Sequence, residues 1–337
     1  MQIMELVEKD IRPRDVMTPA AFHNAETVDM ALGCSTNTML HLPAIAHECG
    51  IELSFDMANE ISARTPNLCH LAPAGDTYME DLERAGGVYA VMAELAQAGL
   101  LDTGTLTCTG RTVAENLEGV VNRNEEIIRP LDNPYSRTGG IAVLKGNLAP
   151  DGCVVKTAGV PPEIWKFRGP ALVVDSQEQA IEVILNDTLK PGMALVIRYE
   201  GPKGGPGMQE MLYPTSFVKG KGIGKQVAML TDGRYSGGSS GLAIGHMAPE
   251  AANKGPVALI KNGDIIDIDI EARSVNVELT DEQLDERRRE LEAGDGYVAH
   301  RNRHVSQALK AYAAFARSAD KGATRDPELI NKLSGLN

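Results

Sequence analysis

A glycine-rich string contains the first residue whose type and position could do chemistry. The string GPKGGPGMQEM covers residues 201–211, and its glycines and prolines predict an irregular loop with exposed backbone N–H groups. Glu210 stands at the end of this loop, where a helix could begin. Its carboxylate could bind a hard cation such as Mg²⁺. Taken alone, it is better explained as an exposed residue in a first helical turn, where the helix dipole favours negative charge.

A second string, TDGRYSGGSSG, covers residues 231–241 and contains two candidate serines. Ser239 satisfies G-x-S-x-G, the nucleophile-elbow pattern, but residues 231–238 separate it from the preceding strand, whereas an elbow needs a tight strand-to-helix turn. Ser236 could act as a base only if a cation or a positive field favoured its alkoxide. Otherwise it is a turn serine that bonds its own backbone.

Small polar residues stand before an apolar run in GCSTNTMLHLP, residues 33–43. Ser35, Thr36 and Asn37 could cradle an anion or a carboxylate, and they could equally be the capped start of a helix. Cys34 has no second Cys or His at the spacing of a zinc site. No Walker A string is present, which argues against nucleotide binding by a P-loop.

Composition bounds the class of protein that could use these residues. The chain has 337 residues, which predicts about two domains. Its net charge of −13 and its lack of a basic run argue against nucleic-acid binding. The sequence has no apolar run long enough to span a membrane and no signal-peptide pattern at its start. The five cysteines are scattered and odd in number, as in reduced cytoplasmic proteins.

The elements that position the three strings change in type along the chain. Apolar spacing, caps and glycine stops predict helices in the first third, at residues 6–11, 27–49 (with a possible break at 35–37), 55–64, 81–95 and 112–117. After about residue 120, short apolar runs between turns predict strands, at residues 141–144, 153–156, 171–174, 194–197, 227–230, 257–260, 265–270 and 275–279. Capping boxes at Ser176 and Thr280 predict two further helices, and residues 305–319 a last one.

These patterns predict an α/β protein in two parts. Residues 1–125 form a helical or α/β domain, and residues 126–337 form a mainly β, barrel-like domain with helical insertions. The second domain contains both Glu210 and Ser236.

Considered together, the strings indicate a protein family far more specifically than any one of them does. GCSTNTMLHLPAIA, NPYSRTGGIAVLKGNLAPDGCVVKTAGV, YEGPKGGPGMQEML and LTDGRYSGGSSGLAIGHMAPEA closely resemble the dihydroxy-acid dehydratase family, whose wider group includes sugar-acid and phosphogluconate dehydratases. The resemblance extends over essentially the whole chain. The segment PAG–YMEDLxxAGG, from Pro73, is more similar to the branched-chain enzyme than to its sugar-acid relatives. One departure is Cys34, where many members have glycine.

The resemblance implies a hydro-lyase that converts a small 2,3-dihydroxy carboxylic acid to a 2-keto acid in valine and isoleucine biosynthesis. In that family a [2Fe-2S] cluster acts as Lewis acid on the leaving hydroxyl, and Mg²⁺ holds the substrate. Glu210 falls on the family's Mg²⁺-ligating glutamate, and Ser236 on its proton-abstracting serine. Ser35, Thr36, Asn37, Gly237 and Gly238 become substrate-binding candidates. The family also implies a cytoplasmic homodimer.

The resemblance also implies that parts of the family's site are missing. Its three cluster cysteines, and the Asp and carbamylated Lys of its Mg²⁺ site, precede the region that resembles this chain. None of the five cysteines matches a cluster position. We therefore expect a C-terminal fragment that is inactive alone. The alternatives are a sugar-acid dehydratase, a serine hydrolase that uses Ser239, and a non-catalytic subunit that docks with a separate N-terminal half.

Overall fold

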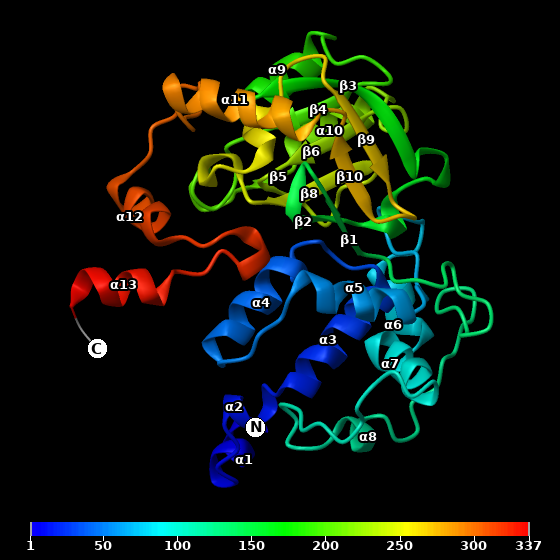
Figure 1. Ribbon diagram of the computed structural model, residues 1–337. Helices are drawn as coiled ribbons and strands as arrows, with labels where there is room; N and C mark the ends of the chain where they lie inside the picture. Colours follow the sequence, from blue (N-terminus) through cyan, green and yellow to red (C-terminus); the bar gives the residue numbers. More distant parts are fainter. Residues whose placement is uncertain (1, 336–337) are drawn as a thin grey trace. The chain divides into compact units, whose positions relative to one another are not determined.

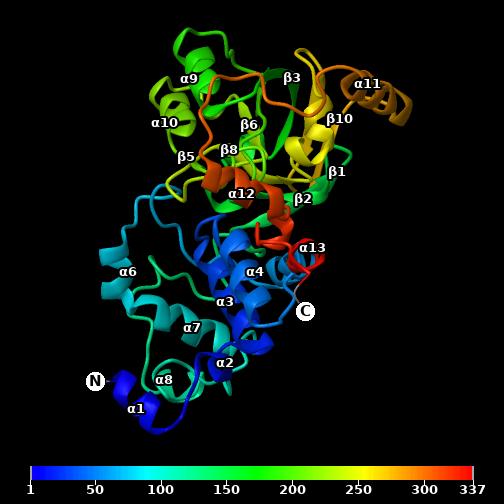
Figure 2. The same ribbon diagram turned by 90° about the vertical axis from the view of Figure 1, so that its left-hand side faces the viewer.

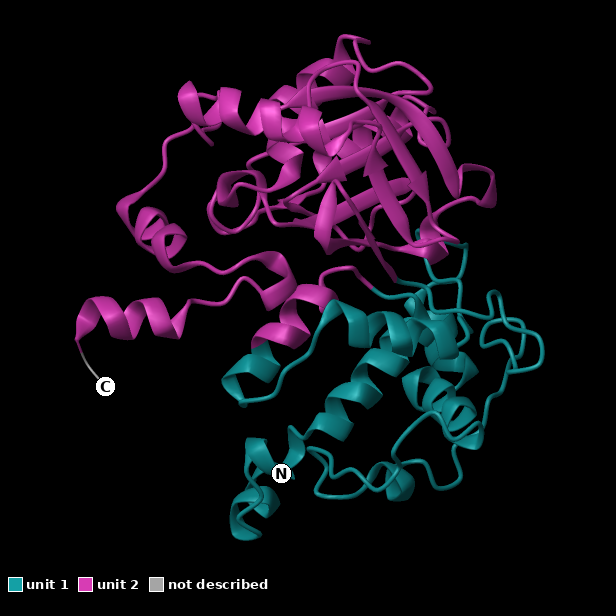
Figure 3. Cartoon of the chain, in the orientation of Figure 1, with its two compact units in different colours: residues 1–34, 45–141 teal, residues 35–44, 142–337 magenta. Residues whose placement is uncertain are grey.

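The computed structural model describes residues 2–335, which form two compact units (Figures 1 and 3). The first unit comprises residues 1–34 and 45–141, and the second comprises residues 35–44 and 142–337. The segment 35–44, which contains the polar string Ser35–Asn37, therefore belongs to the same unit as Glu210 and Ser236.

The first unit is helical. Its helices are α1 (Gln2–Glu8), α2 (Pro13–Val16), α3 (Pro19–Leu32), α5 (Phe55–Arg64), α6 (Met79–Ala85), α7 (Gly87–Gln97) and α8 (Val113–Asn116), while α4 (Thr38–Glu48) begins in the second unit. Buried aliphatic side chains from α3, α6 and α7, with Leu68 and Ile128 from the connecting segments, form its core.

Local signals account for the ends of these helices. Ser54 caps α5 as predicted, because its hydroxyl accepts the Met57 N–H at 3.2 Å. The predicted helix over 27–49 is two helices, since Gly33 ends α3 in the left-handed conformation with φ 61°. The predicted helix over 81–95 is likewise split at Gly86, which has φ 123°.

A buried carboxylate makes the stability of the first unit depend on pH. Glu26 on α3 is 1% exposed, and its Oε2 has no hydrogen-bond partner among the described residues. Burial, and secondarily the charge of Asp29, raises the pKa of Glu26 to about 7. The unfolded chain releases this proton near pH 4.5, so the free energy of unfolding falls as pH rises from about 4.5 to about 7.

Glu26→Gln should therefore stabilise the protein at pH 8 by up to about 3 kcal/mol and have little effect at pH 4. Urea unfolding at both pH values measures the difference. Glu60→Gln, at an exposed position on α5, is the matched control and should change stability little at either pH. An equal effect of both substitutions, or no pH dependence for Glu26→Gln, would contradict the prediction.

The second unit is built on a closed barrel. Its strands follow the order β1-β10-β9-β3-β4-β6-β8-β2. Their bounds are β1 (Ala142–Gly146), β2 (Ala149–Val155), β3 (Lys166–Val174), β4 (Ala194–Ile197), β6 (Ala228–Thr231), β8 (Leu242–Ala248), β9 (Ile265–Asp269) and β10 (Ser274–Val277). Strands β3, β4, β6 and β8 pair in parallel, as do β1 and β10, and the remaining pairs are antiparallel.

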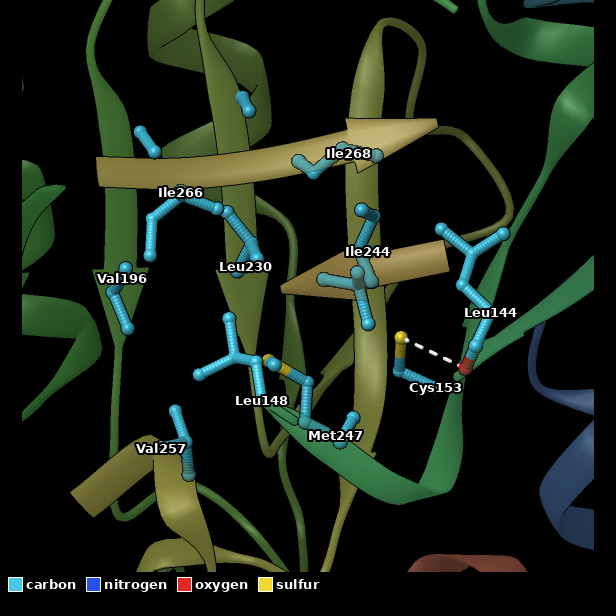
Figure 4. Close-up of a cluster of buried hydrophobic side chains, with 14 of the residues drawn as sticks. Leu144, Leu148, Cys153, Val196, Leu230, Ile244, Met247, Val257, Ile266 and Ile268 are labelled. Atoms are coloured by element: carbon cyan, nitrogen blue, oxygen red, sulfur yellow. Dashed lines mark hydrogen bonds between the residues drawn. The ribbon is translucent and has the colours of Figure 1, made fainter. Parts of the chain in front are cut away.

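Side chains alternate between two apolar layers along the parallel strands. Val196, Leu230 and Ile244 point into the barrel, where they meet apolar side chains from β1, β2 and β9 (Figure 4). Their sequence neighbours, such as Leu195 and Met229, point outward. Two helices, α9 (Gln177–Leu185) and α10 (Tyr213–Gly220), pack on that outer layer (Figure 2).

The barrel confirms the predicted fold class and corrects two details. Residues 257–260 are not a strand: the run belongs to the short 3₁₀ helix η4 (Pro256–Leu259), because Pro256 begins a helical turn and the run is buried without alternation. Strand β8 was not predicted. The elements after the barrel are α11 (Asp281–Ala293), α12 (Gln307–Phe315) and α13 (Pro327–Ser334). Among residues 2–335, none of the helices has the length and apolar character to cross a bilayer.

Candidate functional site

The glycine-rich loop that precedes Glu210 is tied to a buried glutamate. Glu250, which is 1% exposed, accepts the N–H groups of Lys203 at 2.9 Å and Gly204 at 2.9 Å. A Cβ at Gly201 would lie 2.5 Å from the Glu250 carboxylate, so this close approach requires glycine. The expectation that these N–H groups are exposed for a ligand is therefore wrong for Lys203 and Gly204, because Glu250 already uses them.

A second buried carboxylate supports the same loop. Asp232 is fully buried and accepts the N–H groups of Tyr199, Glu200 and Ala251 at 2.9 to 3.0 Å. Burial raises the pKa of Asp232 to about 6 and that of Glu250 to about 7, and the neighbouring carboxylates add to both shifts. The ends of β4 and β6 and the start of the glycine loop are thus held together by side-chain-to-backbone hydrogen bonds.

Two arginines between α11 and α12 hold the loop from outside. Arg303 contacts both oxygens of the fully buried Glu200, at 2.6 and 2.7 Å. Arg301 donates to the carbonyl oxygens of Tyr199 at 2.8 Å and Gly204 at 2.5 Å. Glu200 also accepts the amide of Gln209 at 3.4 Å. This network therefore reaches the residue directly before Glu210.

A two-stranded parallel pair then brings Glu210 beside the serine string. Strand β5 (Glu210–Met211) pairs with β7 (Arg234–Tyr235), with Glu210 opposite Arg234. Ser236 follows β7 directly, after the last residue of the paired strand. Glu210 begins a strand here, and not the helix considered from the sequence.

Asn37 connects the two residues of this pair. Its Nδ2 donates to Glu210 Oε1 at 3.0 Å, and its Oδ1 accepts Arg234 Nη1 at 3.0 Å. Arg234 Nη1 lies 3.7 Å from Glu210 Oε2, and its Nε donates to the Met208 carbonyl oxygen at 2.7 Å. The Glu210 carboxylate, with its side chain 38% exposed, is thus oriented by an amide and a guanidinium.

The other candidates of the polar string have structural roles as well. Ser35 Oγ accepts the Asn37 N–H at 3.3 Å, and the Ser35 carbonyl oxygen accepts the Thr38 hydroxyl at 2.6 Å, as expected at the start of a helix. Thr36 is buried. A Cβ at Gly237 would lie 3.0 Å from Ser35 Oγ, so Ser35 and the serine string are in close contact.

The two serines of TDGRYSGGSSG differ in their surroundings. Ser236 is half-buried, and its Oγ accepts the Gly238 N–H at 3.2 Å. Ser239 is 8% exposed, and its hydroxyl pairs with that of Thr215 at 3.2 Å. Ser239 precedes strand β8 and not a helix, so the nucleophile-elbow geometry considered for it is not formed.

Comparison with known proteins agrees with this arrangement of strings. A family model described as dihydroxy-acid/6-phosphogluconate dehydratase C-terminal matches residues 126–323, and the corresponding N-terminal model matches residues 1–116. The chain belongs to this dehydratase family. The resemblance recognised from the sequence is therefore confirmed, and the dehydratase chain contains regions that match both family models.

Individual relatives are closely similar. The dihydroxy-acid dehydratase of Bifidobacterium longum subsp. infantis is 66% identical over 98% of the chain, and that of Clostridium kluyveri is 58% identical over 96%. The matches cover 59% and 57% of those relatives. The chain thus spans less than two thirds of the length of the dehydratases that it matches.

Cysteine thiols and carboxylates are the side chains of this chain that could bind a metal. Burial raises the pKa of the Cys69 thiol to about 12 and raises that of the Cys153 thiol further. Within residues 2–335, His, Cys, Asp and Glu do not gather in a group of three that could hold a metal. For a hard cation, Glu210 offers one oriented carboxylate.

Two residues near this site were missed by the sequence analysis. Arg234 stands inside the quoted string, two positions before Ser236, so the period-2 spacing of a strand could have indicated it. His246 follows on β8, and its environment is apparent only in three dimensions. A separate cavity of about 600 Å³ is lined by residues of β3, α9, η4 and α11 and by none of the predicted site residues.

Proposed function

We propose that this chain supplies a catalytic base, a cation ligand and substrate-binding groups to a hydro-lyase. Its reaction would dehydrate 2,3-dihydroxy-3-methyl carboxylic acids to 2-keto acids in valine and isoleucine biosynthesis. The observation that carries the proposal is the β5–β7 pairing, which sets Glu210 opposite Arg234 and brings it near Ser236, the residue directly after β7. The substrate class rests on the relatives, which are named dihydroxy-acid dehydratases.

Ser236 is the proposed base. A serine hydroxyl is weakly acidic, so it needs groups that favour its alkoxide. The Gly238 N–H donates to its Oγ, and Arg234, two residues earlier, brings a guanidinium to this part of the chain. In the reaction, the proton of C2 passes to Oγ, and the C–H electron pair forms the C2=C3 bond. Hydroxide leaves C3 and takes up a proton as water, and the enol product tautomerises to the 2-keto acid.

Glu210 is the proposed Mg²⁺ ligand. When bound, Mg²⁺ would stabilise negative charge on the carboxylate and C2 oxygens of the substrate. The Asn37 amide keeps Glu210 Oε1 in one orientation, and Arg234 adds positive charge that favours an anionic substrate. Ser35, Thr36, Asn37, Gly237 and Gly238 are proposed as substrate-binding residues, and the close contact of Ser35 with Gly237 supports this grouping.

We further infer how the chain relates to a complete dehydratase. Residues 1–125 would be the C-terminal part of the family's N-terminal domain, and residues 126–337 its C-terminal domain. The ligands of a [2Fe-2S] cluster would come from outside this chain, which is supported by the scattered positions of its cysteines: within residues 2–335 they do not gather with other donors in a group of three. The chain alone would then be inactive, and the complete enzyme would be a cytoplasmic homodimer.

The test compares the chain alone with a chimera. In the chimera, the chain is preceded by the part of the B. longum subsp. infantis relative that the match leaves uncovered. After anaerobic treatment with iron and sulfide, the chimera should bind iron, absorb visible light and convert 2,3-dihydroxy-3-methylbutanoate with Mg²⁺ present. The chain alone should show substoichiometric iron and no turnover. Stoichiometric, cysteine-bound iron in the chain alone, or a chimera that converts only sugar acids, would contradict the proposal.

A further inference from the structure

His246 is a buried histidine whose ring lacks hydrogen-bond partners. It lies on β8 and is fully buried, and neither Nδ1 nor Nε2 has a partner within the part of the chain that the structure describes. Buried polar side chains in folded proteins are nearly always hydrogen-bonded, so an orphaned imidazole needs an explanation. A bound molecule with oxygen atoms is one such partner.

The backbone at His246 is also unusual. His246 has φ 58°, a left-handed conformation that is uncommon outside glycine. The pairing of β2 with β8 passes from Val154↔Gly245 to Gly152↔Ala248, so three steps on β8 oppose two on β2. This is a β-bulge with His246 inside it, and bulges are frequent beside active sites, where they re-aim a side chain.

The bulge changes the side of the barrel that His246 faces. Ile244 and Met247 both belong to the barrel core (Figure 4), although residues three apart on a regular strand face opposite sides. The alternation of inward and outward side chains is therefore shifted by one residue between Ile244 and Met247. This shift leaves Gly245 and His246 on the outer side of the barrel. The His246 N–H donates to the Gly233 carbonyl oxygen at 2.8 Å, directly before Arg234.

Two charged groups act on His246. Arg234 bonds Asn37 of the candidate site, and His41 lies in the first turn of α4, which begins directly after Asn37. Burial lowers the pKa of His246 to about 3, and the charges of Arg234 and His41 act in the same direction. The ring is therefore neutral at physiological pH, with one nitrogen as donor and the other as acceptor.

We propose that His246 is a ligand-binding residue of the dehydratase site, which hydrogen-bonds an oxygen atom of the bound hydroxy acid or of its 2-keto acid product. This inference rests on the proposed function. The arginine beside it already bonds Met208 and Asn37, whereas both imidazole nitrogens have no partner among residues 2–335. A neutral imidazole can donate to an oxygen on which charge develops without giving up its own proton.

The first test observes the ring directly. Histidine-labelled chimera is studied by two-bond ¹H–¹⁵N NMR, and the His246 signals are assigned by their loss in His246→Gln. Adding 3-methyl-2-oxobutanoate with Mg²⁺ should shift the ring nitrogens of His246 and leave those of His304, which is exposed, unchanged. If the product inhibits turnover, which shows that it binds, but the His246 signals do not shift, the proposal is wrong.

The second test separates a binding role from a structural one. His246→Phe removes both ring nitrogens and should raise KM for the dihydroxy acid about tenfold, as expected for the loss of one hydrogen bond. His246→Gln retains a donor and an acceptor and should recover most of that loss. If KM rises equally in both variants and Tm falls in both, His246 has a role in folding alone. A wild-type chimera without turnover would instead overturn the proposed function, and the NMR shift would still decide the role of His246.

Discussion

Replacing Ser236 by alanine is expected to lower kcat of the assembled dehydratase by roughly 10²- to 10⁴-fold, the usual contribution of a positioned acid–base group. Ser236 is half-buried directly after β7, and its Oγ accepts a backbone N–H. Alanine removes that oxygen and leaves the backbone of the loop in place. KM should change much less than kcat, because the base acts on the C2 proton and not on the substrate carboxylate. The measurement is the rate of 2-keto acid formation by the chimera.

Ser239→Ala is the matched control for Ser236→Ala. The two serines are in one string, but the Ser239 hydroxyl is buried, where it donates to the Thr215 hydroxyl. Its replacement should leave kcat close to that of the unsubstituted chimera. A Ser236→Ala variant that keeps most of its activity would refute the proposed base. Loss of activity in Ser239→Ala, with labelling of Ser239 by a fluorophosphonate, would favour a hydrolase.

Replacing Arg303 by methionine is expected to destabilise the second unit by about 2 to 3 kcal/mol, because it removes two charge-assisted hydrogen bonds from a buried carboxylate that keeps Arg301, at 3.4 Å, and the Gln177 N–H. Glu200 is fully buried, and Arg303 contacts both of its oxygens. The same guanidinium donates to the Gly205 carbonyl oxygen at 3.2 Å, so the glycine loop before Glu210 should also loosen. Urea unfolding of the chain measures the first effect. Faster amide hydrogen exchange at residues 203–208 measures the second.

Arg288→Met provides the comparison for Arg303→Met. Arg288 on α11 pairs with Asp285 at 2.8 Å on the surface, and such exposed pairs contribute less than about 1 kcal/mol. Arg303→Lys should fall between the two, since lysine keeps the charge but cannot contact both carboxylate oxygens with a planar fork. Equal stability of Arg303→Met and Arg288→Met would show that Glu200 does not depend on this arginine.

Local patterns predicted those parts of the fold that depend on local interactions. The capping box at Thr280 forms as expected, with Thr280 Oγ1 accepting the Gln283 N–H and Gln283 Oε1 accepting the Thr280 N–H. Strand β4 is found where its uninterrupted apolar run predicted it. Strand β8 was not predicted, because Gly245 and His246 interrupt its apolar run. The histidine stands in a bulge that only pairing with β2 creates.

The family, and the two residue types on which the proposed chemistry depends, could be predicted without a structure, because Glu210 and Ser236 stand in short strings with recognisable glycines. The groups that contact these strings became apparent from the folded chain alone. Asn37 reaches Glu210 across 173 positions of the chain, and Arg303 reaches Glu200 across 103. Hydrogen bonds between residues so far apart in the sequence leave no periodic pattern of residue types, since they form only when the barrel closes and brings its loops together.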